Sequence, residues 1–389
     1  MKDAFQSLIF LSDPSWTSLL ILPFPQLRNS HKSMKTKIKI TALFTFAIFA
    51  LAYFAPKSEM QTKQTETAGQ KFKNIKVLNE MPADQMGKVM NLMAASLGVN
   101  CSFCHIGNEF EKDGKEEKES AREMLKMTFA LNKTYFDGRP EVSCATCHNG
   151  RAHPQSAPNL NVTQAETRPP QPDAKPAIEQ ILNKYVVALG GKTNLEKITS
   201  RSIKAVRVEP GGKTEPEEIW QKSNKLLMTT KYGDYLVAEA SDGVNAWKRG
   251  NTDEIKLKAD EEEQIKRESQ FFAAVDLKVI YPKMEFGIVD KIDGREVYQI
   301  RATTANNQRE RLYFDVQSGL LVRRLAFTPT ILGNFPYQVD YLDYKDFGGV
   351  KLPLSTRFAL PNITWTRRIA EVKINVPIDD AKFRPFVKN

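Results

Sequence analysis

The chain has 389 residues, 41% of them hydrophobic, so it is too long for one compact core and too apolar to be disordered throughout. Its formal net charge of +10 is spread along the chain, and no block of Lys and Arg is interleaved with aromatic residues. Nucleic-acid binding is therefore not expected.

Residues 34–55 have the pattern of an export signal. Three alternating lysines follow Met34 and lead into a sixteen-residue apolar run. The run is longer than most signal cores and shorter than the ~20 residues of a membrane span, so a cleaved signal peptide and a retained membrane anchor both stay open. Residues 1–33 form an upstream extension, with Met34 as the simplest initiator, and residues 56–70 form a polar tether. We expect a periplasmic protein, attached to the inner membrane where the anchor is retained.

All four cysteines lie within residues 71–153, in two Cys-x-x-Cys-His units. The units are Cys101-Ser-Phe-Cys104-His105 and Cys144-Ala-Thr-Cys147-His148. Two thiols one helical turn apart can add to the two vinyl groups of a haem, and the histidine that follows then lies beneath the iron as an axial ligand. The spacing predicts two covalently attached haem c groups, with His105 and His148 as iron ligands.

Other chemistries of paired cysteines fit less well. A structural zinc site usually places its second pair about 15–20 residues after the first, whereas 39 residues separate Cys104 from Cys144. A thioredoxin-like dithiol would need a βαβ pattern, which is absent from this part of the sequence. Local disulfides would not account for a histidine after each pair. Haem attachment therefore explains the pattern best.

Methionines precede each unit at helical spacing. They are Met86, Met90 and Met93 on a helix predicted over 83–97 and closed by Gly98, and Met124 and Met127 on a helix predicted over 117–136. A methionine stripe is more often core than ligand. Here a stripe precedes both units, which favours one methionine from each helix as the sixth ligand, although spacing does not decide which. Outside the leader and the units, the one other histidine is His153, so at most one iron could take two histidines from this chain.

The residues from Met90 to His105, and from Met124 through Asn132 to Gly150, resemble the cytochrome c subunit family of photosynthetic reaction centres. That family repeats a helix, a tight turn and Cys-x-x-Cys-His, with a helical methionine as sixth ligand. The resemblance implies that Met90 binds the first iron and Met124 the second. Met93 and Met127 are the alternates.

The chain also departs from that family. Its members bind four haems, one of them through a histidine placed between a ligand methionine and its cysteine pair. Here there are two units, and the matching position near Gly138 has no histidine. The resemblance therefore implies a shortened relative with two haems, and it gives little reason to expect docking to a reaction centre.

Residues 154–176 contain six prolines, which predicts a semi-rigid linker. Region 177–389 opens with an amphipathic helix ended by Gly190-Gly191, followed by short alternating segments, regularly spaced turn signals and one acidic helical stretch at about 259–275. We predict an α + β protein of two domains. The first is an α-helical dihaem cytochrome c domain, and the second is an antiparallel β domain, a curved sheet or half-barrel with a few helices.

The stretch Tyr341–Phe358 resembles a hairpin of outer-membrane lipoprotein carriers of the LolA/LolB type, and so does the helix end at Ala188–Gly191. This resemblance implies an apolar cavity under helices and a lipid-like ligand, while a plain scaffold stays equally open. No histidine follows His153, so a Ser-His-Asp triad cannot form there, and Asp379-Asp380 are interpreted as a solvated turn.

The sequence thus predicts an electron carrier, not an enzyme, with two His/Met-ligated haems and redox proteins as partners. Two alternatives stay open. One is a peroxidase-like haem enzyme in which one iron has an open site. The other is a redox-sensing module that binds a lipid or a protein.

Overall fold

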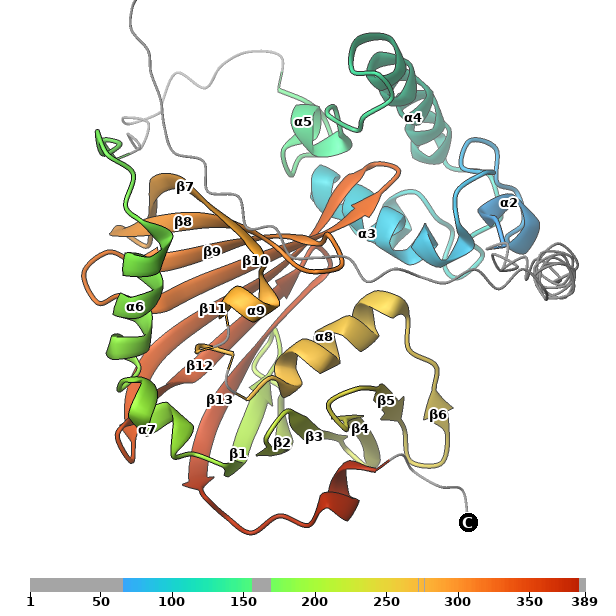
Figure 1. Cartoon of the computed structure of the whole chain (residues 1–389). Helices are drawn as coiled ribbons and strands as arrows, with labels where there is room; N and C mark the ends of the chain where they lie inside the picture. The colour runs from blue at the N-terminus through green and yellow to red at the C-terminus, as the bar shows by residue number, and fades with distance from the viewer. Residues whose placement is uncertain (1–65, 156–168, 272, 276, 385–389) are drawn as a thin grey trace, which may run out of the picture. The chain divides into compact units, whose positions relative to one another are not determined.

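The computed structural model describes residues 66–155, 169–271, 273–275 and 277–384 (Figure 1). The predicted extension 1–33, the export segment 34–55, most of the tether 56–70 and the middle of the linker 154–176 lie outside the described residues. Within the described ranges, no helix is both long enough and apolar enough to cross a bilayer.

Residues 66–155, here called the motif segment, are helical. The helices are α2 (Ala68–Lys71), η1 (Ala83–Gln85), α3 (Met86–Leu97), η2 (Cys101–Phe103), α4 (Glu116–Tyr135) and α5 (Cys144–His148). Both long helices predicted from the sequence are confirmed. Gly98 ends α3 with φ 67°, a left-handed conformation that a glycine adopts without strain.

The core of the motif segment is small. Its buried members are Ala68, Leu78, Met81, Val89, Leu125 and, from far along the chain, Leu332. Met90, Met93 and Cys144 pack against this cluster and are partly buried. The core therefore joins the first methionine helix to the second cysteine unit.

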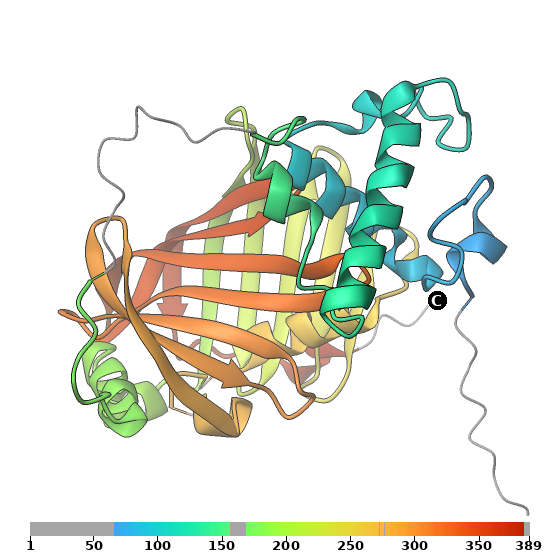
Figure 2. The same cartoon turned by 90° about the horizontal axis from the view of Figure 1, so that it is seen from above.

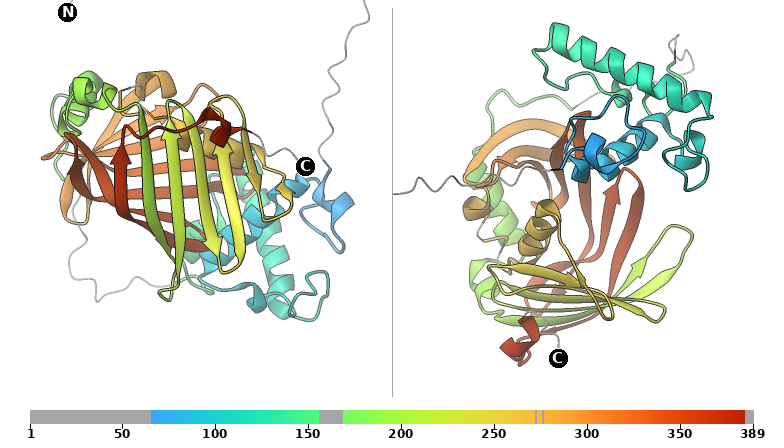
Figure 3. Two further views of the ribbon diagram at one scale, coloured as in Figure 1. Left: turned by 90° about the horizontal axis from the view of Figure 1, so that it is seen from below. Right: turned by 90° about the vertical axis from the view of Figure 1, so that its right-hand side faces the viewer.

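Region 177–384, here called the sheet domain, contains one antiparallel sheet of thirteen strands. They are β1 (Ser200–Val208), β2 (Thr214–Lys222), β3 (Lys225–Tyr232), β4 (Tyr235–Ser241), β5 (Ala246–Arg249), β6 (Glu254–Ile255), β7 (Lys283–Ile292), β8 (Arg295–Thr303), β9 (Arg309–Asp315), β10 (Leu321–Thr330), β11 (Gly333–Phe347), β12 (Val350–Leu360) and β13 (Ile363–Ile374). Each strand pairs with its neighbour in sequence within β1–β6 and within β7–β13, and β1 pairs with β13 to join these two meanders. The sheet curves strongly, as Figures 2 and 3 show, which confirms the predicted curved antiparallel sheet.

The helices of the sheet domain are α6 (Ile178–Ala188), α7 (Lys192–Glu196), α8 (Ala259–Ser269), α9 (Leu277–Ile280) and η3 (Asp380–Phe383). The predicted amphipathic helix is α6, and it buries Ile181, Leu182 and Tyr185 against strands β7–β10. Burial of each such side chain contributes about 1.5–3 kcal/mol. Helix α8 covers the β1–β3 half through Ile265, and it ends at Ser269, earlier than the predicted stretch.

Two stretches that carry the LolA-type resemblance lie against each other. Gly190, at the end of α6, has φ 119°, and a Cβ there would come within 2.0 Å of the Gly349 carbonyl oxygen in the β11–β12 turn. The Lys351 amide donates to the Leu189 carbonyl at 2.9 Å. Glycine at position 190 is thus required both by its conformation and by this close approach.

Contacts also join the motif segment to the sheet domain. Residues 65–389 form one compact unit. Leu332, in the β10–β11 turn, is 1% exposed within the core of the motif segment, and Lys88 of α3 pairs with Asp260 of α8 at 2.7 Å. That region 177–389 folds alone stays a prediction, and these contacts show where the two regions support each other.

Candidate haem-attachment sites

The first cysteine unit forms a tight turn rather than a long helix. Cys101 lies in the 3₁₀ helix η2, and the His105 amide donates to its carbonyl at 3.0 Å. Cys101 is exposed and Cys104 is half-buried. Burial raises the pKa of the Cys104 thiol. The turn therefore places the two cysteines at the two ends of η2, with Cys101 as its first residue and Cys104 directly after its last.

The second unit is the short helix α5. Ser143 caps it, since the Ser143 amide donates to Oγ1 of Thr146 at 3.0 Å. Cys147 is exposed, while Cys144 is half-buried and burial raises the pKa of its thiol. The predicted spacing of one helical turn between the two thiols is present here.

The surroundings of His148 suit an iron ligand. Its Nδ1 lies 2.9 Å from the Arg151 carbonyl oxygen. Because a carbonyl oxygen only accepts, we assign the proton to Nδ1, which leaves the lone pair on Nε2 for a metal. A hydrogen bond of this kind fixes the orientation of the ring and makes the ligand nitrogen more basic.

His105 is held differently. Its Nδ1 is buried and makes no hydrogen bond of ordinary geometry to any described residue, and the ring meets Phe110 edge-on at 5.2 Å between centroids. The pKa of His105 is lowered, first by burial and then by the charge of Lys118, while the Phe110 backbone partly offsets this. The neutral imidazole that iron requires is therefore favoured.

The four candidate methionines fall into two environments. On α4, Leu125 and Phe129 face the core, whereas Met124 and Met127 are 44% and 45% exposed. On α3, Met90 and Met93 are partly buried against the core that also contacts Cys144. The pairing of Met90 with the first iron and Met124 with the second stays a prediction.

Several large apolar side chains of the motif segment are exposed in the polypeptide alone. Besides the two methionines of α4, they include Ile106 and Phe110 after the first unit and Tyr135 at the end of α4. These side chains lie near the cysteine units in sequence or on the neighbouring helix α4, where a bound apolar group could cover them. A porphyrin attached to the neighbouring cysteines would cover some of them. The thiols, the two histidines and these exposed apolar side chains together fit a haem.

Two contacts that fix the second unit were not predicted. The amide of Gly150 donates to the Ser96 carbonyl at 2.8 Å, and a Cβ on Gly98 would come within 2.2 Å of the Gly150 oxygen. The Asn132 side chain donates to the Val142 carbonyl at 2.8 Å and accepts from its amide at 2.9 Å. A buried Asn in a helix was the sequence signal for this clamp, since such residues bond backbone that would otherwise lack a partner.

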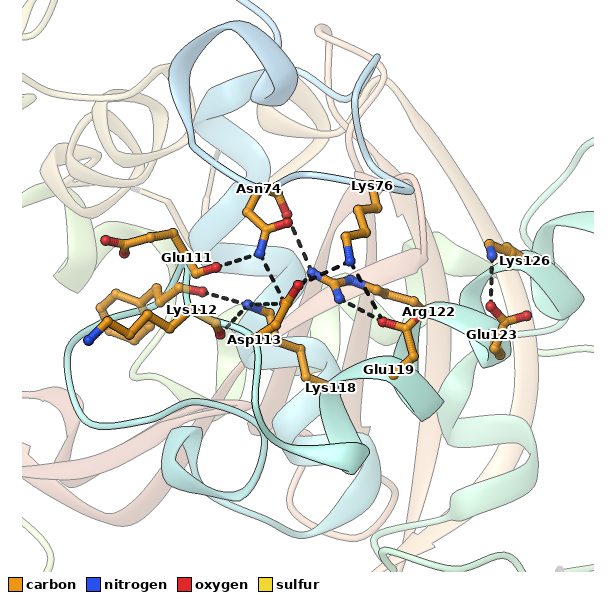
Figure 4. A network of polar contacts seen from close by, with 11 residues as sticks. Asn74, Lys76, Glu111, Lys112, Asp113, Lys118, Glu119, Arg122, Glu123 and Lys126 are labelled. Atoms are coloured by element: carbon orange, nitrogen blue, oxygen red, sulfur yellow. Dashed lines mark hydrogen bonds and ion pairs between the residues drawn. The ribbon is translucent and has the colours of Figure 1, made fainter.

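A polar network holds the loop after His105 (Figure 4). The Asp113 carboxylate pairs with Lys76 at 3.0 Å, Lys118 at 3.2 Å and Arg122 at 2.9 Å, and it accepts from Asn74 at 2.9 Å. The hydrogen bonds from Lys76 and Arg122 hold the pKa of Asp113 far below its usual range. The network joins three separate stretches of the chain, so no local sequence pattern predicted it.

Lys118 also fixes the loop itself. Its ammonium donates to the carbonyls of Phe110 at 3.0 Å and Lys112 at 2.7 Å. This places a positive charge beside the ring that meets His105 edge-on. Lys118 is itself paired with Asp113, whereas the polar contact of His148 is a neutral carbonyl.

Residues 35–188 match the family model described as photosynthetic reaction centre cytochrome C subunit. The predicted resemblance is confirmed. Cytochrome c-554 of Chloroflexus aurantiacus is 35% identical over 82 residues, which are 20% of this chain and 20% of that protein. The photosynthetic reaction center cytochrome c subunit of Roseobacter denitrificans is 28% identical over 105 residues, 22% of this chain and 28% of that protein. The chain thus spans less than a third of the length of these relatives.

Solved structures similar to the sheet domain have low identity to it. A DUF1329 family protein from Desulfovibrio piger has 13% identity and a TM-score of 0.40, covering 53% of this chain and 97% of its own. A LolA superfamily protein from Nitrosomonas europaea has 10% identity and a TM-score of 0.37, with the same coverage.

Proposed function

We propose that this chain is a c-type cytochrome with two haems that transfers electrons and is not an enzyme. The observation that carries the proposal is the pair of Cys-x-x-Cys-His units, each on a short helical turn. In both units the histidine is held in a form suited to bind iron. The match of residues 35–188 to a cytochrome family supports the same conclusion. When bound, haem supplies a one-electron iron couple.

Each of the candidate site residues has a proposed role. The four thiols would hold the porphyrins, and His105 and His148 would each bind one iron. Arg151 orients His148 through its carbonyl oxygen. One methionine of α3 would bind the first iron and one of α4 the second, with Met90 and Met124 the proposed choices and Met93 and Met127 the alternates. Two filled axial positions would leave no open site for a substrate, in contrast to a peroxidase-like enzyme.

The two sites should differ in reduction potential. Lys118, Lys115 and Arg122 all lower the pKa of His105 by their charge. The same positive charge favours the ferrous over the ferric state, because reduction removes one positive charge from the iron site. We therefore expect the first haem to have the higher potential of the two, and Lys118→Gln to lower that potential and leave the second nearly unchanged.

The proposed setting is the periplasm. Residues 34–55 carry the export pattern, and haem c is attached on the outer side of the cytoplasmic membrane, so the two features agree. The proposed partners are a redox donor and a redox acceptor, together with the inner membrane where the segment is retained as an anchor.

The experiment is to produce the full chain in a host that matures c-type cytochromes, and then to measure its mass and its oxidised spectrum. The mass should exceed that of the polypeptide by two haems, and the oxidised spectrum should show a charge-transfer band from methionine–iron ligation. A high-spin spectrum from one iron would instead support the haem enzyme, and a protein without covalent haem would refute the proposal.

A further inference from the structure

A cavity of about 330 Å³ is lined by strands of the sheet and by the helices packed on them. This volume lies at the lower end of the range of about 300–1,000 Å³ that is usual for ligand sites. The cavity lies between two hydrophobic clusters, one beneath α6 and α9 and the other beneath α8. Its apolar lining includes Leu189, Ile203, Met228, Leu312 and Phe358. An apolar ligand chain in this cavity would therefore contact apolar side chains of the lining.

Arg201 of β1 reaches into this cavity. Its Nε donates to Oε1 of Gln221, directly across on β2, at 2.6 Å, and its guanidinium lies over the Phe271 ring at 5.0 Å. Within the described part of the chain, its two terminal nitrogens make no hydrogen bond, and no carboxylate lies within ion-pair distance. Burial lowers the pKa of Arg201 to about 10, so the guanidinium stays charged at neutral pH.

Other arginines at this cavity have carboxylate partners. Arg367 pairs with Glu217 at 2.6 Å, and Glu217 helps to raise the pKa of that arginine. Arg267 and Arg324 share the buried carboxylate of Glu310. Arg201 differs from all three, because no described carboxylate is paired with it.

The remaining acid at the cavity does not neutralise Arg201. Glu268 lies 3.9 Å from Arg367, and burial raises its pKa. Its backbone oxygen, not its carboxylate, accepts from Gln221 at 2.8 Å. The cavity therefore carries an unbalanced positive charge at Arg201. A partly buried charge without a counter-ion among the described residues is unfavourable for folding, so stability alone does not explain Arg201.

We propose that the cavity binds an amphiphile with one apolar chain and one anionic headgroup, and that Arg201 holds the headgroup. The two free terminal nitrogens of a guanidinium match the two oxygens of a carboxylate or the oxygens of a phosphate monoester. Gln221 positions the guanidinium by accepting from Nε, which directs the other nitrogens away from the strand. The apolar lining of the cavity then contacts the apolar chain of the ligand.

The test uses the full-length protein after its lipids have been extracted, with calorimetric titration of four probes that share a twelve-carbon chain. They are dodecanoate, dodecyl phosphate, dodecanol and dodecyltrimethylammonium. Either anion should bind roughly ten-fold or more tightly than dodecanol, since hydrogen bonds to charged groups are the stronger ones. The cation should bind most weakly. The better of the two anions identifies the headgroup as carboxylate or phosphate.

The deciding variant is Arg201→Met, which keeps the length of the side chain and removes the charge. It should retain dodecanol binding and lose the preference for anions, and without ligand it should melt at the same or a higher temperature. The matched control is Arg301→Met, an exposed arginine on β8, which should change neither property. Should Arg201→Met fail to fold, Arg201→Lys replaces it and should weaken anion binding by losing the two-pronged contact.

Three results would overturn the proposal. The first is equal affinity of the wild-type protein for dodecanoate, dodecyl phosphate and dodecanol. The second is a variant at position 201 that keeps the full preference for anions. The third is a protein that binds none of the four probes.

Discussion

The motif segment and the sheet domain each contain groups that their own fold leaves unsatisfied, but of opposite kinds. The motif segment has a small core and exposes large apolar side chains such as Phe110, at 54%, and Tyr135, at 72%. The sheet domain buries its apolar residues in several clusters, and it also holds partly buried arginines, one of which, Arg201, has no counter-ion among the described residues. The first region therefore matches a large apolar group, and the second an anion.

This difference has a physical basis. A short helical segment cannot bury enough apolar surface by itself to offset its conformational entropy, so a covalently attached porphyrin can serve as part of its core. A larger domain buries a greater share of its surface on folding, which can offset the cost of a partly buried charge. The predictions that follow test the comparison, from the largest expected effect to the smallest.

The largest effect is expected from removing one attachment site. Cys101→Ala together with Cys104→Ala should reduce the haem count from two to one and reduce the helical content of the motif segment. Mass spectrometry gives the count, and circular dichroism with hydrogen exchange locates the loss. The β signal of the sheet domain should stay. A variant that keeps two haems, or that loses its β signal as well, would contradict the comparison.

The next effect concerns the contact between the regions. Leu332→Ala removes a side chain that is 1% exposed in the core of the motif segment, and such truncations cost about 2–5 kcal/mol. Chemical denaturation of the holoprotein, followed at the haem absorbance, should show this loss. The adjacent Ile331 is 39% exposed, so Ile331→Ala is the matched control and should change stability little. Equal effects would show that the β10–β11 turn does not support the motif segment.

Replacing the axial methionines tests each iron separately. Met90→Ala should convert the first haem to a high-spin or water-ligated form and lower its potential, because a thioether favours ferrous iron. Met124→Ala should do the same for the second haem. Visible spectra and redox titration report both effects. Should Met93→Ala or Met127→Ala do this instead, the alternate ligands are correct.

The parts of the fold that depend on local chemistry could be predicted from sequence. Turn signals such as Asp293-Gly294 and Asn306-Asn307 fall at hairpins, and Asp293, Gly294 and Asn307 all have positive φ there. Such residues adopt that conformation at low cost, so the signal lies in the turn itself. The long helices followed from apolar spacing in the same way.

Contacts between distant segments could not be predicted. The pairing of β1 with β13, which closes the two meanders into one sheet, joins strands with no mutual signal in sequence. The burial of Leu332 in the core of the motif segment depends likewise on contacts between distant segments. So does the lack of a described carboxylate partner for Arg201. For the candidate sites, the cysteines and histidines were evident from spacing, whereas Asp113 acts partly through Asn74 and Lys76, which lie in a separate stretch of the chain.

The smallest expected effect is at Asp113, where Asp113→Asn removes the charge at the centre of the network in Figure 4. Because the pKa of Asp113 is lowered on folding, its stabilising contribution is fully present above the unfolded pKa of about 4 and is lost as pH falls further through the folded value. The variant should therefore melt below the wild type at pH 7, and the difference should shrink in acid. It should also shrink in high salt, because the carboxylate is exposed and the ion pairs are screened.

Glu123→Gln is the matched control for Asp113, because it breaks one exposed pair on α4, with Lys126 at 2.7 Å, and Glu123 has no bond to Asp113 or its partners among the described residues. It should change the melting temperature little at any pH. In Asp113→Asn the loop after His105 should loosen, so the spectrum of the first haem should become more sensitive to pH than that of the second. A change of equal size at both haems would mean that the network stabilises the whole motif segment rather than the first site. A variant that matches the wild type at pH 7 would mean that the three cations hold the loop without the carboxylate.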